Sequence, residues 1–315
     1  MQKELQSRRR IRLFMDVRRL NEIRKLVIVA LFSDDDLMDV FVLKGGNAIS
    51  LVYELDYRAS QDIDVSMAGD FDEKELCVVK QKLEWALTVT FREQGYVIFD
   101  VKLEPRPMQL DENKIDFWGG YQLEFKIVER ATFNLYKSDL AALRRRAVAV
   151  SEDQKKIFRV DISKYEFCTV KETRDLDGYR IYVYTPVMVI YEKLRAICQQ
   201  MEAYNKVVPT HKPRARGRDF FDIHLFIEKR NLYDTLHDPE NLGLLEKIFA
   251  AKRVPLKLLS QIRDESEFHR HDFQAVIATV ATDYDLRDFD FYFDYVVRLT
   301  ESLKNALECK ASNDR

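Results

Sequence analysis

The chain has 315 residues, of which 46% are hydrophobic and 33% charged, and its formal net charge is −2, as expected for a globular protein of one or two lobes. No apolar run approaches the roughly 18–20 residues that span a bilayer, so a helical membrane protein is excluded and we expect a soluble, cytoplasmic one. The four cysteines lie far apart without a CxxC pair, which excludes a disulfide framework or a zinc site.

The first half of the chain mixes helical and strand-like patterns. Apolar residues at helical spacing predict a helix over residues 1–35, followed by a polar break. The next predicted elements are, in chain order, a strand at 40–46, a helix capped by Asn47, a strand at 62–67 and a helix at 72–94. They are followed by strand-like sequence from 95 to 136, a helix around 138–148 and strands at 156–167 and 179–186.

The second half is predicted to be almost entirely helical. Pro186 suits the first position of a helix whose apolar residues fall on one face. A basic loop and a further helix follow, and the pattern stays helical after about residue 230. The predicted architecture is α+β, with a mixed sheet and flanking helices in residues 1–185 and a mainly α-helical lobe in residues 186–315.

Two carboxylates, Asp62 and Asp64, stand at alternate positions of a predicted strand. Side chains two residues apart on a strand point to the same face. Like charges held that close are costly unless a cation lies between them, and oxygen ligands suit Mg²⁺. The pair therefore favours a metal site, although two such aspartates alone are a weak pattern.

Gly45 and Gly46 separate the preceding strand from the helix that follows it. A glycine turn lets backbone N–H groups approach a triphosphate, and a helix N-terminus favours anions. Together with the aspartates, this stretch is interpreted as a nucleotide site, with glycines at the phosphates and carboxylates at the metal.

Three motifs occur in the order of a known family. They are LKGGNAISLVYEL with SQDIDVS (residues 43–66), YEKLRA (191–196) and RGRDFFDI (216–223). Together they resemble the AbiEii/AbiGii-type toxins of the DNA polymerase β-like nucleotidyltransferase superfamily. The resemblance covers roughly residues 40–228, and the ends of the chain match none of the family's motifs.

The resemblance implies a polymerase-β-like sheet and a metal-dependent transfer of a nucleoside monophosphate from an NTP to an acceptor. Some relatives modify tRNA, so tRNA or another RNA is the expected acceptor. The resemblance also implies a toxin of a type IV-like toxin–antitoxin or phage-defence system, with a cognate antitoxin or its DNA-binding partner. Two alternatives stay open: a catalytically degenerate nucleotide-binding scaffold, and a nucleotidyltransferase that modifies a protein hydroxyl.

The same resemblance assigns roles within the first motif. Asp62 and Asp64 would be catalytic and bind Mg²⁺ or Mn²⁺. Four residues would contact the triphosphate of the NTP: Gly45, Gly46, Asn47 and Ser50. Asn47 stands where the family usually has Thr or Ser, and an asparagine side chain can still cap a helix.

The later motifs supply the opposite wall of the predicted site. Lys193 and Asp219 match the family's second catalytic pair, with the lysine on phosphate. Arg216 and Arg218 end a basic segment, and we expect them to contact the phosphates of the NTP or of RNA.

The superfamily commonly has a third carboxylate on a later strand, which binds metal and accepts the proton of the incoming hydroxyl. Asp161 is our preferred residue, because Arg159, Asp161 and Ser163 alternate with apolar residues there. Glu124, in the strand-like segment YQLEFKIV, is the rival.

Overall fold

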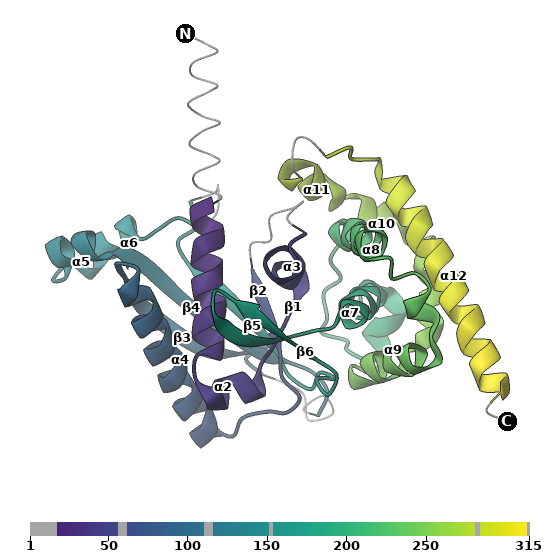
Figure 1. The fold of residues 1–315 in the computed structure, drawn as a ribbon, viewed down its shortest axis with the longest axis horizontal. Helices are drawn as coiled ribbons and strands as arrows, with labels where there is room; N and C mark the ends of the chain where they lie inside the picture. Colours follow the sequence, from purple (N-terminus) through teal and green to yellow (C-terminus); the bar gives the residue numbers. More distant parts are fainter. Residues whose placement is uncertain (1–17, 56–61, 110–115, 151–153, 281–283, 314–315) are drawn as a thin grey trace, which may run out of the picture.

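A computed structural model describes residues 18–55, 62–109, 116–150, 154–280 and 284–313. The strands and their flanking helices form one half of the molecule, and the later helices form the other half beside it (Figure 1). The predicted α+β class is confirmed.

The sheet has seven strands in the order β3-β4-β5-β2-β1-β7-β6. The strands are β1 (Val42–Lys44), β2 (Ile63–Ser66), β3 (Tyr96–Arg106), β4 (Gly120–Glu129), β5 (Phe158–Ser163), β6 (Glu172–Leu176) and β7 (Tyr179–Val183). β2 pairs with β5 and β1 with β7 in parallel, and the other neighbours are antiparallel. The sheet is therefore mixed, as predicted, and the two short central strands bring Lys44 and Asp64 next to each other.

Helices flank this sheet. They are residues 18–32, α2 (Asp35–Val40), α3 (Gly45–Asn47) with the π-helical turn η1 (Ala48–Val52), α4 (Glu73–Glu93), α5 (Arg130–Tyr136) and α6 (Leu140–Arg146). Asp34 caps α2, and Asp72 forms a capping box with Glu75 at the start of α4. These polar caps explain why both helices begin where the local sequence predicts a break.

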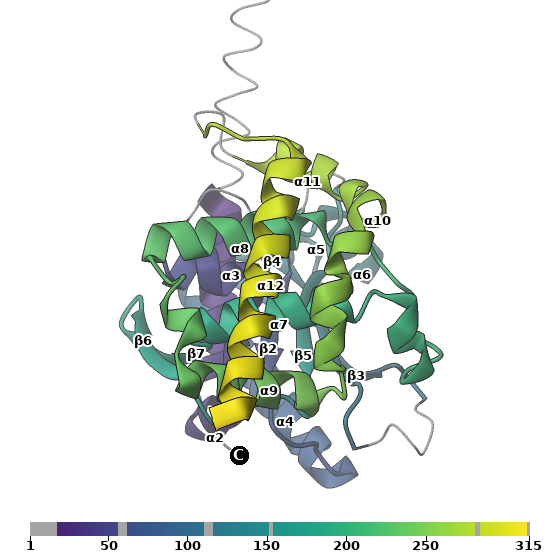
Figure 2. The same ribbon diagram turned by 90° about the vertical axis from the view of Figure 1, so that its right-hand side faces the viewer.

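The helical half contains α7 (Pro186–Cys198), η3 (Glu202–Lys206), α8 (Gly217–Arg230), η4 (Thr235–His237), α9 (Pro239–Ala251), η5 (Leu256–Asp264), α10 (Ser266–Arg270), α11 (Phe273–Thr279) and α12 (Phe289–Asn313). α12 runs along the outer side of this half, away from the sheet (Figures 1 and 2). Its Phe289 and Phe293 pack against Phe220 of α8, and its Tyr292 packs against Phe221. Aromatic contacts thus fix α8, which carries Asp219, against the longest helix of this half.

Buried apolar residues form one cluster that runs through both halves, from Ile23 to Leu303. The predicted domain division at 185/186 stays a prediction. Within the described ranges, every helix falls short of the length and apolarity needed to cross a membrane.

Some predicted elements are wrong in detail. Residues 130–136, predicted as strand, form α5, which buries none of its side chains and therefore lies outside the sheet. β6 was not predicted, because its sequence is polar and four of its five residues are at least partly exposed at the sheet edge. Of the predicted helix 1–35, residues 1–17 lie outside the described residues.

Candidate active site

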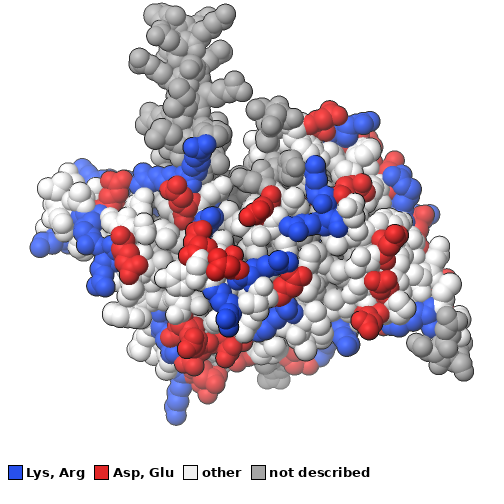
Figure 3. Space-filling model, in the orientation of Figure 1, with Lys and Arg blue, Asp and Glu red and all other residues white. Residues whose placement is uncertain are grey.

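A cleft of about 770 Å³ lies between the sheet and the helical half. Its lining includes nine of the predicted site residues: Gly45, Gly46, Asp62, Asp64, Asp161, Lys193, Arg216, Arg218 and Asp219. Acidic and basic side chains are interspersed over the face shown in Figure 3, without a large area of one sign. This face therefore offers no extended basic surface for a polyanion, and we expect a polyanion to be recognised by the charged residues that line the cleft.

Asp64 lies on β2 between a lysine and a second aspartate. In the strand register its partners are Lys44 on β1 and Asp161 on β5, and neighbouring strands lie ~4.8 Å apart. Burial and the charges of Asp161, Glu192 and Asp62 raise the pKa of Asp64 to about 7, although Lys44 opposes the shift. Burial and the charge of Asp161 also raise the pKa of Asp62. The carboxylates therefore form a group of buried, mutually repelling anions at one end of the cleft.

The geometry favours Asp161 over Glu124 as the third carboxylate. Asp161 lines the cleft beside Asp64 and accepts a hydrogen bond from Nε2 of Gln122 at 2.9 Å. Glu124 instead pairs with Arg159 at 2.9 Å, and it does not line the cleft.

The donor chemistry at this end of the cleft suits a hard divalent cation. In the described ranges, no three His, Cys, Asp or Glu side chains are gathered as a ready-made metal site. Mg²⁺ commonly takes only one or two carboxylates and completes its shell with phosphate oxygens and water. Asp62 and Asp64 meet that need, and a bound cation would relieve the repulsion that raises their pKa values.

Gly45 occupies a position that only glycine suits. Its φ of +71° is in the left-handed region, and a Cβ atom there would lie 2.4 Å from Oδ2 of Asp64. The backbone of the glycine turn therefore lies directly against the carboxylate.

We expect Gly45→Ala to lower the free energy of unfolding by more than ~1 kcal/mol and to impair catalysis, because the methyl group would displace Asp64. Gly69→Ala is the matched control, since its Cβ would meet nothing within 4 Å, and it should change stability by less than ~0.5 kcal/mol. Chemical denaturation and a transfer assay measure the two effects. If the two variants had the same stability and activity, the close contact between position 45 and Asp64 would be contradicted.

Asn47 occupies the N-cap position of η1, as predicted, but its side chain makes no capping hydrogen bond there. The helical turn α3 already begins at Gly45, and Asn47 is its last residue, with 1% of its surface exposed. Its Nδ2 donates a hydrogen bond to the backbone oxygen of Asp62 at 2.6 Å. Asn47 thus ties the glycine turn to the start of β2, and neither it nor Ser50, which is also buried, lines the cleft.

On the opposite wall, Lys193 of α7 is buried between two carboxylates of α8. Its Nζ donates to Oδ1 of Asp219 at 2.7 Å and to Oδ2 of Asp222 at 2.9 Å. Although burial alone would lower it, these two charges raise the pKa of Lys193. Arg216 lies 2.6 Å from Asp219, measured from Nε to Oδ2, so the two predicted motifs of this half form one ion-pair network.

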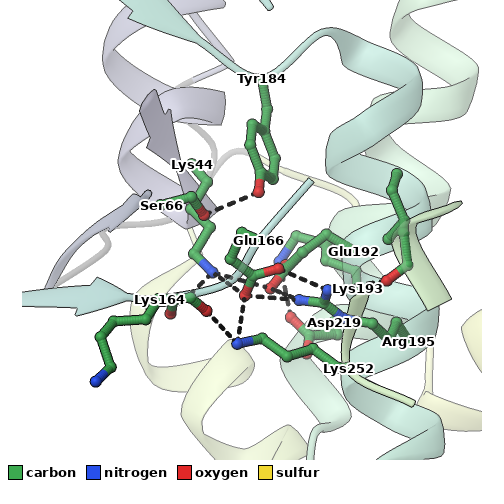
Figure 4. A network of polar contacts seen from close by, with 12 residues as sticks. Lys44, Ser66, Lys164, Glu166, Tyr184, Glu192, Lys193, Arg195, Asp219 and Lys252 are labelled. Atoms are coloured by element: carbon green, nitrogen blue, oxygen red, sulfur yellow. Dashed lines mark hydrogen bonds and ion pairs between the residues drawn. The ribbon is translucent and has the colours of Figure 1, made fainter. Parts of the chain in front are cut away.

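A second network, which was not predicted, contributes to the lining of the same cleft (Figure 4). Glu166 is buried between Lys44 at 3.3 Å, Arg195 at 2.7 Å and Lys252 at 3.8 Å. Glu192 accepts from the same Lys44 at 3.4 Å and from Arg195 at 3.5 Å. Sheet and helical half are therefore joined by buried charges as well as by apolar contacts.

These charges shift one another's pKa values. Burial would raise the pKa of Glu166, but Arg195, Lys44 and Lys252 hold it well below its usual range. Burial lowers the pKa of Lys252 to about 8. The positive charges of Arg195 and Lys44 lower this pKa further, whereas the negative charge of Glu166 opposes the shift. Lys44 could have been noticed from the sequence, because it is a charged residue at the end of an apolar strand. The sequence around Glu166 and Lys252 has no pattern that indicates a buried charge.

Comparison with known proteins identifies the family. The profile described as nucleotidyl transferase AbiEii toxin of type IV toxin–antitoxin systems matches residues 27–295. The chain belongs to the AbiEii family. The match confirms the resemblance and the predicted enzyme class, nucleotidyltransferase, and it extends beyond the three motifs at both ends. An NTP substrate and an antitoxin partner follow from membership of the AbiEii family.

Two solved structures are distantly similar to this AbiEii-family chain. JHP933 from Helicobacter pylori has a TM-score of 0.46 and 15% identity, covering 94% of this chain and 95% of that one. An antigenic nucleotidyltransferase-like protein from Paracoccidioides brasiliensis has a TM-score of 0.37 and 14% identity, covering 81% and 93%. A search of curated proteins gave no match. The assignment therefore rests on the AbiEii profile.

Proposed function

We propose that this AbiEii-family protein transfers a nucleoside monophosphate from an NTP to the terminal hydroxyl of an RNA, with tRNA as the acceptor class and Mg²⁺ or Mn²⁺ as the cofactor. The supporting observation is that Asp62, Asp64 and Asp161 line the sheet side of a cleft whose opposite wall carries Lys193 and two arginines. Such an arrangement brings metal-binding carboxylates and phosphate-binding cations to the same substrate.

In the proposed reaction the acceptor oxygen attacks the α-phosphorus of the NTP, and the bond from that phosphorus to the bridging oxygen breaks. Pyrophosphate leaves, and Asp161 accepts the proton of the hydroxyl. A divalent cation on Asp62 and Asp64 would neutralise the charge that develops on the phosphates. The turn at Gly45 and Gly46 would hold the outer phosphates through backbone N–H groups.

The cations of the helical half have complementary tasks. Lys193 is fixed by two carboxylates, which suits a group that must hold a phosphate in one position. Arg216 and Arg218 line the cleft with partly exposed side chains, 37% and 49% accessible, and can contact the phosphates of NTP or RNA.

Incubation of the purified protein with each α-³²P-labelled NTP, Mg²⁺ and total tRNA tests this proposal. We expect label to appear in RNA, to require the divalent cation, and to be lost when EDTA is added. Lys193→Met should reduce transfer by ~10²-fold or more, because a phosphate-contacting charge is removed. Arg263→Met, at an exposed ion pair on η5, is the control that should leave transfer unchanged.

The alternatives give different results in the same assay. Label in protein rather than RNA would replace the RNA acceptor by a protein hydroxyl. Saturable NTP binding without transfer to any acceptor would favour the degenerate scaffold.

A further inference from the structure

The cleft extends beyond the carboxylates to a tryptophan. On β4, Gln122 lies beside Asp161, and Trp118 precedes it by four residues. Trp118 therefore lies just before the start of β4, beyond Gln122 as seen from its partner Asp161. Trp118 is partly exposed and lines the cleft.

The opposite wall reaches the same place along α7. Lys193 and Ala196 of this helix and its C-cap, Gln199, line the cleft at intervals of three residues. Gln199 donates from Nε2 to the hydroxyl of Tyr204 at 3.4 Å, and the Tyr204 ring lies 6.1 Å from that of Trp118. The two walls therefore converge at the end of the cleft that lies away from Asp64.

The indole is held in place by its neighbours. Tyr204 is fully buried, and its hydroxyl donates to the backbone oxygen of Lys252 at 2.7 Å. The ring of His211 contacts Trp118 edge-on, with centroids 5.8 Å apart. A large aromatic ring that is fixed on one side and borders a polar cleft on the other is a surface on which a base can stack.

Two adjacent glutamines, the C-cap of α7 and the residue after it, differ in their partners. Gln200 is committed to the protein, since it donates to the Ala196 oxygen and accepts from the Arg214 amide, both at 2.8 Å. Among the described residues, the side chain of Gln199 makes only the long hydrogen bond to Tyr204. Its amide therefore has a donor and an acceptor to offer to the edge of a base.

We propose that Trp118 and Gln199 form a nucleobase site, in which a base stacks on the indole and bonds to the amide. This inference rests on the proposed function, because that places the reacting phosphate at the aspartates. The base belongs either to the NTP or to the unpaired end of the acceptor RNA, and the two sources share this chemistry.

Fluorescence provides a direct test, because the chain contains two tryptophans and the other, Trp85, is 67% exposed on α4. In a Trp85→Phe protein, Trp118 is the only reporter. We expect saturable quenching by NTPs in Mg²⁺, or by a short single-stranded RNA if the base belongs to the acceptor. Inorganic tripolyphosphate, which has no base, should compete with NTP for binding without quenching.

Steady-state kinetics of Trp118→Leu give a second measurement. Loss of stacking, worth ~1–3 kcal/mol, should raise the KM of the substrate that carries the base by roughly 5- to 150-fold, with a smaller effect on kcat. Trp118→Phe keeps an aromatic ring and should lose much less, and thermal melting confirms that both variants are folded. Gln199→Leu should change the ratio of kcat/KM between NTPs if the base is that of the NTP, or between acceptor RNAs with different terminal bases if it is that of the RNA.

The outcomes separate this inference from the proposed function. Transfer activity and tripolyphosphate competition without quenching by NTP or RNA would overturn the nucleobase site and leave the transferase proposal standing. A Trp118→Leu variant with unchanged KM for both substrates would overturn it as well. Absence of tripolyphosphate binding together with absence of transfer would count against the proposed function itself.

Discussion

Asp64→Asn should abolish nucleotidyl transfer while making the metal-free protein more stable at pH 8. Burial and the charges of Asp161, Glu192 and Asp62 raise the pKa of this carboxyl to about 7. The folded state therefore binds the proton more tightly than the unfolded state, so Asp64 destabilises the fold progressively as the pH rises from about 4 to 7. Asparagine removes that charge, and we expect a gain of about 2–4 kcal/mol at pH 8.

Denaturation in EDTA at pH 8 and at pH 4 measures this effect, and the gain should shrink toward zero at the lower pH. Transfer should fall by ~10³-fold or more, because a ligand of the proposed metal is lost. Asp177→Asn is the control: its ion pair with Lys25 is exposed, so stability should change by less than ~1 kcal/mol at either pH. An inactive Asp64→Asn protein that is also less stable at pH 8 would contradict carboxylate repulsion as the cause.

Glu166→Gln should destabilise the protein strongly although the substitution is conservative. The glutamine has nearly the same shape, but Lys44, Arg195 and Lys252 would lose the charge that compensates them. Removing one partner of a buried ion-pair network costs about 3–5 kcal/mol, which corresponds to a fall in Tm on the order of 10 °C.

The stability difference between wild type and the Glu166→Gln variant should depend on pH. The pKa of Glu166 is lowered in the folded state, so its contribution is present above the unfolded value near 4.3 and is lost as the pH falls below it. The difference between wild type and variant should therefore narrow in acid. Glu301→Gln, at an exposed ion pair with Arg263, is the matched control and should shift Tm little. A Glu166→Gln protein that melts with the wild type would refute the stabilising role of the network.

Helices with strong local signals were predicted well. α4 begins at a capping box, and α7 begins with Pro186 after the N-cap Thr185. Residues next to each helix therefore indicate where it begins. The polar strand β6 gave no such signal, because its place at the sheet edge depends on pairing with β7. Local patterns therefore predict elements whose causes are local, and they miss elements that tertiary pairing creates.

The same distinction applies to the site. Asp62 and Asp64 were found because their spacing on a strand has a direct chemical meaning. Asn47 was assigned from its position before a helix, but its side chain bonds instead to the backbone of Asp62, which only the folded chain brings near. The cluster around Glu166 draws its cations from three separate elements, and no spacing in the sequence could relate them.

The lysine at the end of α9 is translated much later than the residues it contacts in the sheet half. Lys252 donates from Nζ to the backbone oxygens of Phe117 and Lys164, and it is the last of the cations around Glu166 to be translated. A nascent chain that ends before this lysine already contains the aspartates, Lys44 and Arg195, but it lacks the third cation beside Glu166 and the ammonium group that binds the Phe117 oxygen. The lining of the cleft therefore combines residues from about the first fifth of the chain, such as Lys44 and Asp64, with a lysine that is translated about two hundred residues later.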